Sequence, residues 1–288
     1  MYGISYWIVP IFSGFVWLGM LLGMLLWWTV KEGSRHLTPE GPTQNIAYIS
    51  DIGAHQLQPL FIAAGSTSVV TFTLTFIVER WLRHRGRLVR NDSKGQKILS
   101  ICSIIAAFVG MIGLIILTCL NDVSHHKAHD ACLVIFIGGY IVSAIFICAE
   151  YQRLGMHHRE HRHLRMSFWI KLAFIFLELG LAIAFGVLRD REKYNPAAVV
   201  EWVIAFVYTF YVWSFFIDFI PAVIYKDGFG NKYESRETEV EMATAMEQEA
   251  RDRGYPGGVA QEQHAYSNGT ANNGNGHYTE PAVPSRNF

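Results

Sequence analysis

Charged residues are scarce in this chain. Only 17% of its 288 residues are Asp, Glu, Lys or Arg, and 51% are hydrophobic, whereas a soluble domain carries about a quarter charged residues. The chain also lacks an excess of either sign, because 24 basic and 24 acidic side chains give a formal net charge of zero. The charge of the whole chain therefore says nothing about partners, and only local charge can; no nucleic-acid partner is expected.

The hydrophobic residues that are present occur in blocks. Each block approaches the roughly 20 residues that a helix needs to cross a bilayer. A water-soluble domain has no use for six apolar helices of this length, so residues 1–228 are predicted to form an all-α, polytopic membrane domain with six transmembrane helices. The six runs lie at about 6–30, 59–82, 98–120, 131–151, 167–188 and 200–225.

Beyond about Gly230 the composition becomes polar and rich in Asn, Gly, Pro and Ser. Such a segment cannot bury enough apolar surface to fold. Residues 229–288 are therefore predicted to be a mostly disordered cytosolic tail. A richer content of Glu, Ala and Met over 234–253 indicates a short helix within it, which either solubilises the tail or docks a partner.

Two further absences narrow the class of protein. No basic residue precedes the first apolar run and no small-residue cleavage site follows it, so this run is expected to remain as a span rather than to be a cleaved signal. The 12 histidines lie in loops, at the ends of runs or in the tail. Axial haem ligands would have to lie within the spans, so a haem protein is excluded and no cofactor is predicted.

Basic residues are unevenly divided between the loops. The loops after the second and fourth runs hold ten Lys and Arg residues, against six in the other three. The positive-inside bias therefore places both termini and these two loops in the cytosol. The same loops either meet anionic inner-leaflet phospholipids or only determine topology. The candidate lipid contacts are Arg83, Arg85, Arg87, Arg90, Arg159, Arg162 and Arg165.

Charged residues within the apolar runs are costly, and four of them are candidates for an intramembrane polar cluster. Glu178 lies near the middle of the fifth run, while Lys171, Asp218 and Glu150 fall nearer the cytosol. One interpretation is an ion-pair cluster in which Lys171 pairs with Asp218 or Glu150 and joins the last three spans. The other is a lipid-headgroup or proton site, which an unpartnered Glu178 would favour. Separately, Gly19 and Gly23 form a small-residue pattern that favours close helix approach.

The four cysteines fall in two layers. Cys119 and Cys132 lie at the outer ends of the third and fourth runs, and Cys102 and Cys148 lie near their inner ends. If these runs form a hairpin, Cys119 and Cys132 become neighbours on the oxidising side, where a disulfide can form. Buried free thiols are the alternative, and the one that we favour.

Polar residues gather in the segments predicted to lie outside. Imidazoles and carboxylates from separate segments resemble a zinc ligand set, and a zinc-activated water there could attack a lipid ester or amide. The spacing matches no zinc motif, so no metal is predicted, and a hydrogen-bonded cap in which Asp51 or Ser50 caps the second span is the alternative. The candidate residues are Ser50, Asp51, Gly53, His55, His125, His126, His129, Asp130 and Glu201.

Two segments carry a resemblance to a known family. The turn Tyr48-Ile49-Ser50-Asp51-Ile52-Gly53-Ala54 and the segment His125-His126-Lys127-Ala128-His129-Asp130, with six spans, resemble the Frag/DRAM/Sfk family over about 1–228. The Asn- and Gly-rich tail is most like the fungal suppressor-of-four-kinase branch. The resemblance implies a link to plasma-membrane phosphatidylinositol 4-kinase and to phospholipid asymmetry. It supplies no catalytic residues.

We therefore expect a non-enzymatic integral protein of the plasma membrane that regulates phosphoinositide 4-kinase signalling or phospholipid asymmetry. Its expected partners are anionic inner-leaflet phospholipids and a phosphatidylinositol 4-kinase complex. Two alternatives stay open from other family branches. One is a metal-dependent lipid or GPI-anchor remodelling hydrolase, and the other is a lysosomal or vacuolar autophagy modulator.

Overall fold

The computed structural model describes residues 6–34, 44–88, 93–120, 122–157, 162–224 and 242–249. Within these ranges the regular structure is helical throughout and contains no strand. The chain divides into two units, 1–232 and 233–288. The described part of the second unit is one exposed helix over 242–249. The first unit contains α1 (Ile8–Leu26), the π-helical turn η1 (Trp27–Lys31), α2 (Ile49–Gly53), α3 (Gln58–His84), α4 (Lys94–Cys119), α5 (Asp122–His157), α6 (Arg162–Asp190), α7 (Tyr194–Ser214) and α8 (Phe216–Ile224).

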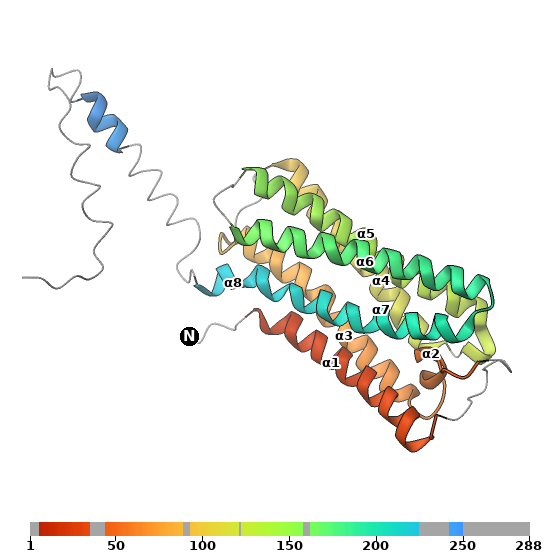
Figure 1. Ribbon diagram of the computed structural model, residues 1–288. Helices are drawn as coiled ribbons and strands as arrows, with labels where there is room; N and C mark the ends of the chain where they lie inside the picture. The colour runs from red at the N-terminus through yellow and green to blue at the C-terminus, as the bar shows by residue number, and fades with distance from the viewer. Residues whose placement is uncertain are drawn as a thin grey trace, which may run out of the picture. The chain divides into compact units, whose positions relative to one another are not determined.

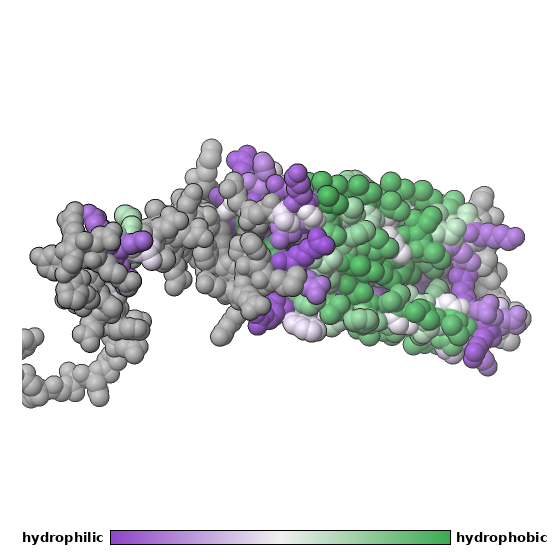
Figure 2. Space-filling model, turned by 90° about the horizontal axis from the view of Figure 1, so that it is seen from above, coloured by the Kyte–Doolittle hydropathy of each residue, from purple (hydrophilic) through white to green (hydrophobic). Residues whose placement is uncertain are grey.

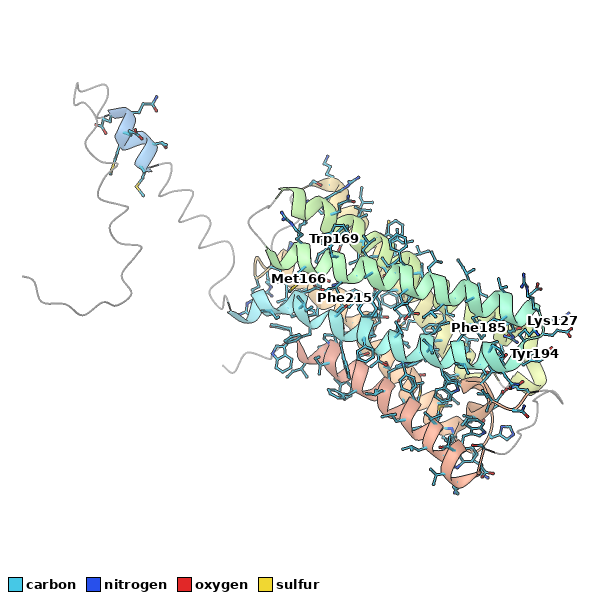
Figure 3. The ribbon with its side chains drawn as sticks, in the orientation of Figure 1. Lys127, Met166, Trp169, Phe185, Tyr194 and Phe215 are labelled. Carbon is cyan, nitrogen blue, oxygen red and sulfur yellow. The ribbon has the colours of Figure 1, made fainter. Side chains whose placement is uncertain are left out.

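Six of these helical segments are long and apolar enough to cross a membrane, which confirms the predicted fold class. Figure 2 shows the resulting hydrophobic band between two polar ends of the bundle. Large apolar side chains such as Met166 and Trp169 on α6 remain exposed on its surface (Figure 3), as expected where lipid replaces water. The spans are Ile8–Lys31, Gln58–His84, Lys94–Cys119, Lys127–Leu154, Arg165–Asp190 and Tyr194–Ile220.

The six spans form a closed ring. Successive helices pack in the order α1, α3, α4, α5, α6 and α7, and α7 packs back on α1. The short helix α2 lies at one end of this bundle and α8 at the other (Figure 1), and we call these the α2 end and the α8 end. Aromatic rings fill the middle: the Phe72 ring centroid lies 5.8 Å from that of Tyr208 and 5.3 Å from that of Phe215.

Helices α4 and α5 approach each other closely, and this approach depends on glycine. A Cβ atom on Gly139 would lie 2.6 Å from the backbone nitrogen of Gly110, and one on Gly113 would lie 2.8 Å from that of Phe136. The Gly19 and Gly23 pattern, expected to mark such an approach, is not used in this way. A Cβ on Gly19 meets nothing within 4 Å, and one on Gly23 meets only the Leu60 side chain at 3.5 Å.

Two neighbouring glycines of α5 offer a matched test of this packing. We expect Gly139→Ala to destabilise the bundle by about 1–3 kcal/mol, because the added methyl group meets backbone that cannot move aside. Gly138→Ala should be neutral or stabilising by up to about 1 kcal/mol, since its Cβ meets open space and alanine favours helix. Thermal unfolding of the two variants in detergent checks this. Equal melting temperatures would contradict the glycine contact.

All four cysteines are free thiols in the structure, so the predicted hairpin carries no disulfide between Cys119 and Cys132. The alternative of buried thiols holds for Cys132 and Cys148. It is wrong for Cys119, which is exposed, and only partly right for Cys102, which is half-buried. Cys102 and Cys119 lie on α4, whose outward surface is apolar. A thiol on such a lipid-facing surface does not have to be buried by other helices.

Candidate functional site

Asp51 organises the α2 end of the bundle. Its side chain is buried, with the residue 3% exposed. Its Oδ2 atom accepts hydrogen bonds from the Tyr48 backbone N–H and from Gln44 Nε2, each at 2.9 Å. Asp51 therefore caps α2 from within its first turn, so the predicted cap of the second span is instead a cap of this separate short helix. Ser50, the residue before it, lines a cavity.

Gly53, in the same turn, allows close contact between α2 and α3. A Cβ on Gly53 would lie 2.5 Å from the Phe61 ring of α3. Helix α2 thus packs so closely against α3 that no side chain larger than a hydrogen atom fits at this position. His55 closes the turn, because its Nδ1 atom lies 2.8 Å from the backbone oxygen of Asp51.

The segment before α2 is tied to the start of α7. Glu201 Oε2 accepts the Ile49 backbone N–H at 2.8 Å, and the indole of Trp202 donates to the Ala47 carbonyl at 3.0 Å. Asn195 Oδ1 accepts two further backbone N–H groups, of Asn45 and Ile46. Sequence reasoning found Glu201 but missed Asn195 and Trp202. Nothing in their local sequence shows that a segment 150 residues away would meet them.

Tyr48 completes this connection. Its hydroxyl donates to the backbone oxygen of Tyr194 at 3.1 Å. Burial raises the pKa of the Tyr48 phenol, and the nearby Glu201 and Asp51 raise it further, although Arg189 opposes them. The phenol consequently remains protonated and acts as a hydrogen-bond donor at physiological pH.

The predicted histidine and aspartate set does not converge on one point. His129 is buried, with Nδ1 3.3 Å from the Leu120 backbone oxygen, and Asp130 forms an ion pair with Arg189 at 2.6 Å. His125 and His126 belong to the first turns of α5, but their side chains lie outside the described part of the structure. Among the described residues, no three His, Cys, Asp or Glu side chains form a metal-like group.

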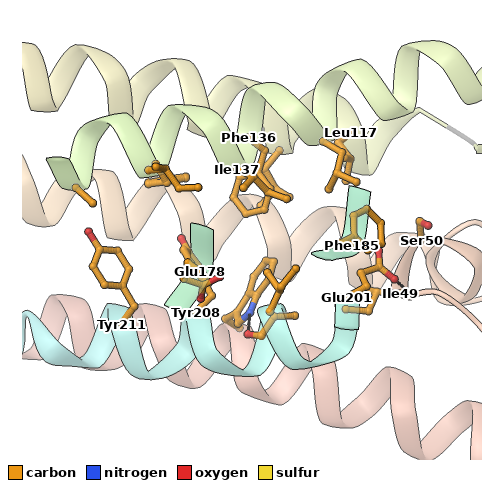
Figure 4. A pocket seen from close by; sticks show the side chains of 18 of the residues that line it. Ile49, Ser50, Leu117, Phe136, Ile137, Glu178, Phe185, Glu201, Tyr208 and Tyr211 are labelled. Atoms are coloured by element: carbon orange, nitrogen blue, oxygen red, sulfur yellow. Dashed lines mark hydrogen bonds between the residues drawn. The ribbon is translucent and has the colours of Figure 1, made fainter. Parts of the chain in front are cut away.

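A cavity of about 100 Å³ lies within the ring of helices, well above the roughly 10–15 Å³ that one water molecule needs. It extends from Ser50, His129 and Glu201 at the α2 end to Glu178, Tyr208 and Tyr211 deep in the bundle (Figure 4). Between these ends its wall is aliphatic and aromatic. Further lining residues include Trp17, Leu117, Leu133, Phe136, Tyr140, Phe174, Phe185 and Ile204.

Three polar atoms beside the deep part of this cavity are unsatisfied. Within the described structure, Glu178 Oε1 and the hydroxyls of Tyr208 and Tyr211 are buried without a hydrogen-bond partner. Leaving such atoms unpaired in an apolar interior costs roughly 1–3 kcal/mol each. A bound molecule with polar atoms would remove that cost. The sequence signalled Glu178 by its depth, but it did not reveal the two tyrosines or the cavity.

A buried ion pair lies between this cavity and the α8 end. Lys171, with 0% exposure, places its Nζ atom 2.6 Å from Asp218 Oδ2, and Ser167 bonds both groups. The same Nζ lies 4.3 Å from the ring centroid of Phe215. Of the two partners predicted for Lys171, the structure selects Asp218.

Glu150 belongs to a second charged group, together with Arg83. Arg83 is 4% exposed, forms an ion pair with Glu79 at 2.6 Å and lies 3.9 Å from Glu150. The Tyr151 hydroxyl donates to Glu79 as well, at 2.7 Å. The prediction that Arg83 contacts inner-leaflet lipid is therefore wrong, because its guanidinium is enclosed by acids of its own bundle.

The other predicted lipid contacts differ in position. Arg85 and Arg165 are exposed and Arg87 is half-exposed. The Arg85 guanidinium lies over the Trp81 ring, 4.9 Å from its centroid. Arg90 and Arg159, and the side chain of Arg162, lie outside the described residues. Three cations of the predicted set are thus available at the α8 end.

The fold and the site define a multi-pass helical membrane protein with an internal cavity inside its ring of spans. Residues 5–222 match the model of the Frag1/DRAM/Sfk1/Cwh43P N-terminal domain. Since this match covers most of the chain, the protein belongs to that family, as its spans and its Ser-Asp-Ile-Gly turn indicated.

Two fungal relatives extend this result. The chain is 27% identical over 224 residues to Protein sfk1 of Schizosaccharomyces pombe, which covers 78% of this chain and 66% of that protein. It is 24% identical over 263 residues to Protein SFK1 of Saccharomyces cerevisiae, covering 69% of this chain and 73% of that one. No solved structure matches the chain.

Proposed function

We propose that this protein regulates membrane lipids at the plasma membrane without being an enzyme. Its effect would be on phospholipid asymmetry or on phosphoinositide 4-kinase signalling. The observation that carries the proposal is the cavity, which combines a hydrocarbon wall with unsatisfied polar atoms deep in the membrane domain. A pocket of this composition suits an amphiphile. Membership of the Frag1/DRAM/Sfk1 family agrees with it.

The arrangement at the α2 end favours this function over the hydrolase alternative. The carboxylates that would hold a metal or activate water already serve the fold: Asp51 caps α2, Glu201 accepts the Ile49 N–H, and Asp130 pairs with Arg189. Breaking these contacts to serve a reaction would loosen the segment that closes the bundle. The autophagy alternative has no feature of the described residues in its favour.

The proposed topology places the α8 end in the cytosol, where the exposed Arg85, Arg87 and Arg165 would meet anionic phospholipids or a kinase complex that carries them. Each basic residue near such a surface contributes about 1 kcal/mol. Together the three would enrich anionic lipid around the α8 end. The enclosed Arg83 is not part of this surface.

A complementation experiment tests the proposed function. The full chain is expressed in Saccharomyces cerevisiae cells that lack SFK1, and two quantities are measured: phospholipid exposed in the outer leaflet, and plasma-membrane phosphatidylinositol 4-phosphate. We expect the chain to restore at least one of them. The triple variant Arg85→Gln, Arg87→Gln, Arg165→Gln should restore less, whereas Arg191→Gln, an exposed residue at the α2 end, should act like the parent chain. If neither quantity responds to the parent chain at its normal surface level, the proposal fails.

Two glycosylation sequons test the orientation. Asn91-Asp92-Ser93 and Asn268-Gly269-Thr270 both lie in segments that the proposed topology places in the cytosol, where no N-glycan is added. We expect no mobility change on treatment of the expressed protein with an N-glycosidase. A sequon engineered between α6 and α7, by Glu192→Asn with Tyr194→Thr, reports on the opposite side. A glycan on Asn91 or Asn268 would reverse the topology.

A further inference from the structure

The charge of the cavity wall restricts what can occupy it. Two acids, Glu178 and Glu201, line the cavity, while no Lys or Arg does so. His129 is the one lining side chain that can become positively charged, and it is buried beside a backbone oxygen. A low-dielectric enclosure strengthens such an imbalance. An unpaired carboxyl in such an enclosure takes up either a cation or a proton to balance its charge, so the wall favours a cationic group over an anionic one.

Glu178 is the acid left for such a cation. Four of the other acids in the described spans lie within 4 Å of a cation: Glu79 and Glu150 are near Arg83, Asp218 is near Lys171 and Asp130 is near Arg189. Of the remaining two, Glu201 accepts the Ile49 backbone N–H and Asp190 is exposed at the end of its span. Glu178 has no such partner there, and its Oε1 atom makes no hydrogen bond. An acid inside a membrane domain is normally paired or functional, so the missing partner points to a ligand.

Aromatic rings line the same cavity as Glu178. The Tyr208 ring centroid lies 5.2 Å from that of Trp17 and 6.0 Å from that of Phe136, and Tyr140, Phe174 and Tyr211 also line the cavity. Glu178 lies next to Tyr208 on this wall (Figure 4). The faces of Trp and Tyr rings attract ammonium groups, and an aromatic cage with a nearby carboxylate is how proteins recognise alkylated ammonium.

We propose that this cavity binds an organic ammonium group of the choline or ethanolamine type, with its positive charge at Glu178 and its alkyl substituents against the aromatic wall. The Tyr208 and Tyr211 hydroxyls then donate to oxygen atoms of the same molecule. The apolar wall toward the α2 end takes the adjoining hydrocarbon, which makes an ammonium-bearing phospholipid a better occupant than a free amine. In naming a lipid class this inference rests on the proposed function.

Binding to the full chain, purified in an uncharged maltoside detergent, tests this site. Native mass spectrometry measures the affinity for four probes: hexadecylphosphocholine, hexadecyltrimethylammonium, hexadecanol and free choline. The first two should bind at least about tenfold more tightly than hexadecanol, since only they carry the cation. Binding of hexadecylphosphocholine without binding of choline identifies a lipid as the source. Comparable binding of choline identifies a soluble amine instead, which would overturn the assignment of a phospholipid.

Variants of Glu178 distinguish a charge contact from simple partitioning of the probe's alkyl chain into the cavity. Glu178→Gln keeps the shape of the side chain and should weaken the two cationic probes by about tenfold, with hexadecanol unchanged. Asp190→Asn is the matched control, because it removes one acid from the exposed end of the same helix. It should leave all affinities as they are. Glu178→Asp retains the charge and should fall between the parent chain and Glu178→Gln, which guards against a folding defect in either variant.

Two results would overturn the site: equal affinity for hexadecanol and the cationic probes, or unchanged cation binding in Glu178→Gln. Neither bears on the proposed function, which is measured in cells. Restored lipid distribution without ammonium binding would leave a lipid regulator that lacks this site. Ammonium binding without any effect in cells would support the ammonium site and contradict the proposed role in lipid regulation.

Discussion

Replacement of Lys171 by methionine is expected to destabilise the bundle by about 3–5 kcal/mol, because it leaves the Asp218 carboxylate as an uncompensated buried charge. The Lys171 ammonium is completely enclosed, 2.6 Å from that carboxylate, and also lies over the Phe215 ring. Figure 3 shows Phe215 inside the bundle, toward α8. Equilibrium unfolding of the purified chain in mixed detergent micelles measures the loss.

Two further variants make this prediction specific. Lys127→Met removes an exposed lysine near the start of α5 and should change the free energy of unfolding by less than about 0.5 kcal/mol. The double variant Lys171→Met, Asp218→Leu removes both charges and should recover most of the stability, since a packed apolar pair can replace a buried ion pair. A double variant no more stable than Lys171→Met would show that the pair is not the source of the effect.

The second large effect is expected at Asp51. Asp51→Ala leaves the Tyr48 N–H and the Gln44 amide without their common acceptor in a buried site, which costs about 2–3 kcal/mol. Since the same segment joins α7 through Glu201 and Trp202, residues 44–53 should open together. Hydrogen exchange of the Tyr48 amide should accelerate by roughly 30- to 150-fold. Ser50→Ala, one residue away with no hydroxyl contact of comparable kind, should leave exchange nearly unchanged.

Asp51→Asn distinguishes structure from catalysis at this position. The asparagine keeps one oxygen that can accept the Tyr48 N–H, so protection and lipid regulation should largely survive. A carboxylate that held a metal or activated a water would lose its function in the same variant. Loss of function in Asp51→Asn with normal exchange rates would therefore revive the hydrolase alternative.

The intramembrane charges mark the limit of what depth along the chain can predict. Lys171, Asp218 and Glu150 were all expected at a similar level, because each helical residue advances by about 1.5 Å. Depth does not tell which way a side chain points around its helix. Packing of α6 against α8 brings Asp218 to Lys171, whereas Glu150 turns toward Arg83 on α3.

The pairing of Arg83 has a signal in the local sequence. Glu79 lies four residues before it, which places the two side chains on one helix face, and the structure pairs them. Because Arg83 lies near the end of the second run, beside the basic loop, its position along the chain predicts a surface residue. For Gly139 and Gly110 there was no comparable signal. Glycine is common in membrane helices, and only the crossing of α4 and α5 distinguishes these positions from Gly19 and Gly138.

The sequence by itself determined the membrane class, the six spans and the family, because these depend on the length of apolar runs and on a local turn, and both can be read along one chain. The tertiary structure alone decided the partners. Closure of α7 on α1 completes the ring around the cavity and brings Asn195, Glu201 and Trp202 to the segment before α2. Packing of α6 on α7 places Glu178 beside Tyr208. Such contacts join residues far apart in the chain, and their positions follow from the rotation and crossing of whole helices rather than from any local pattern.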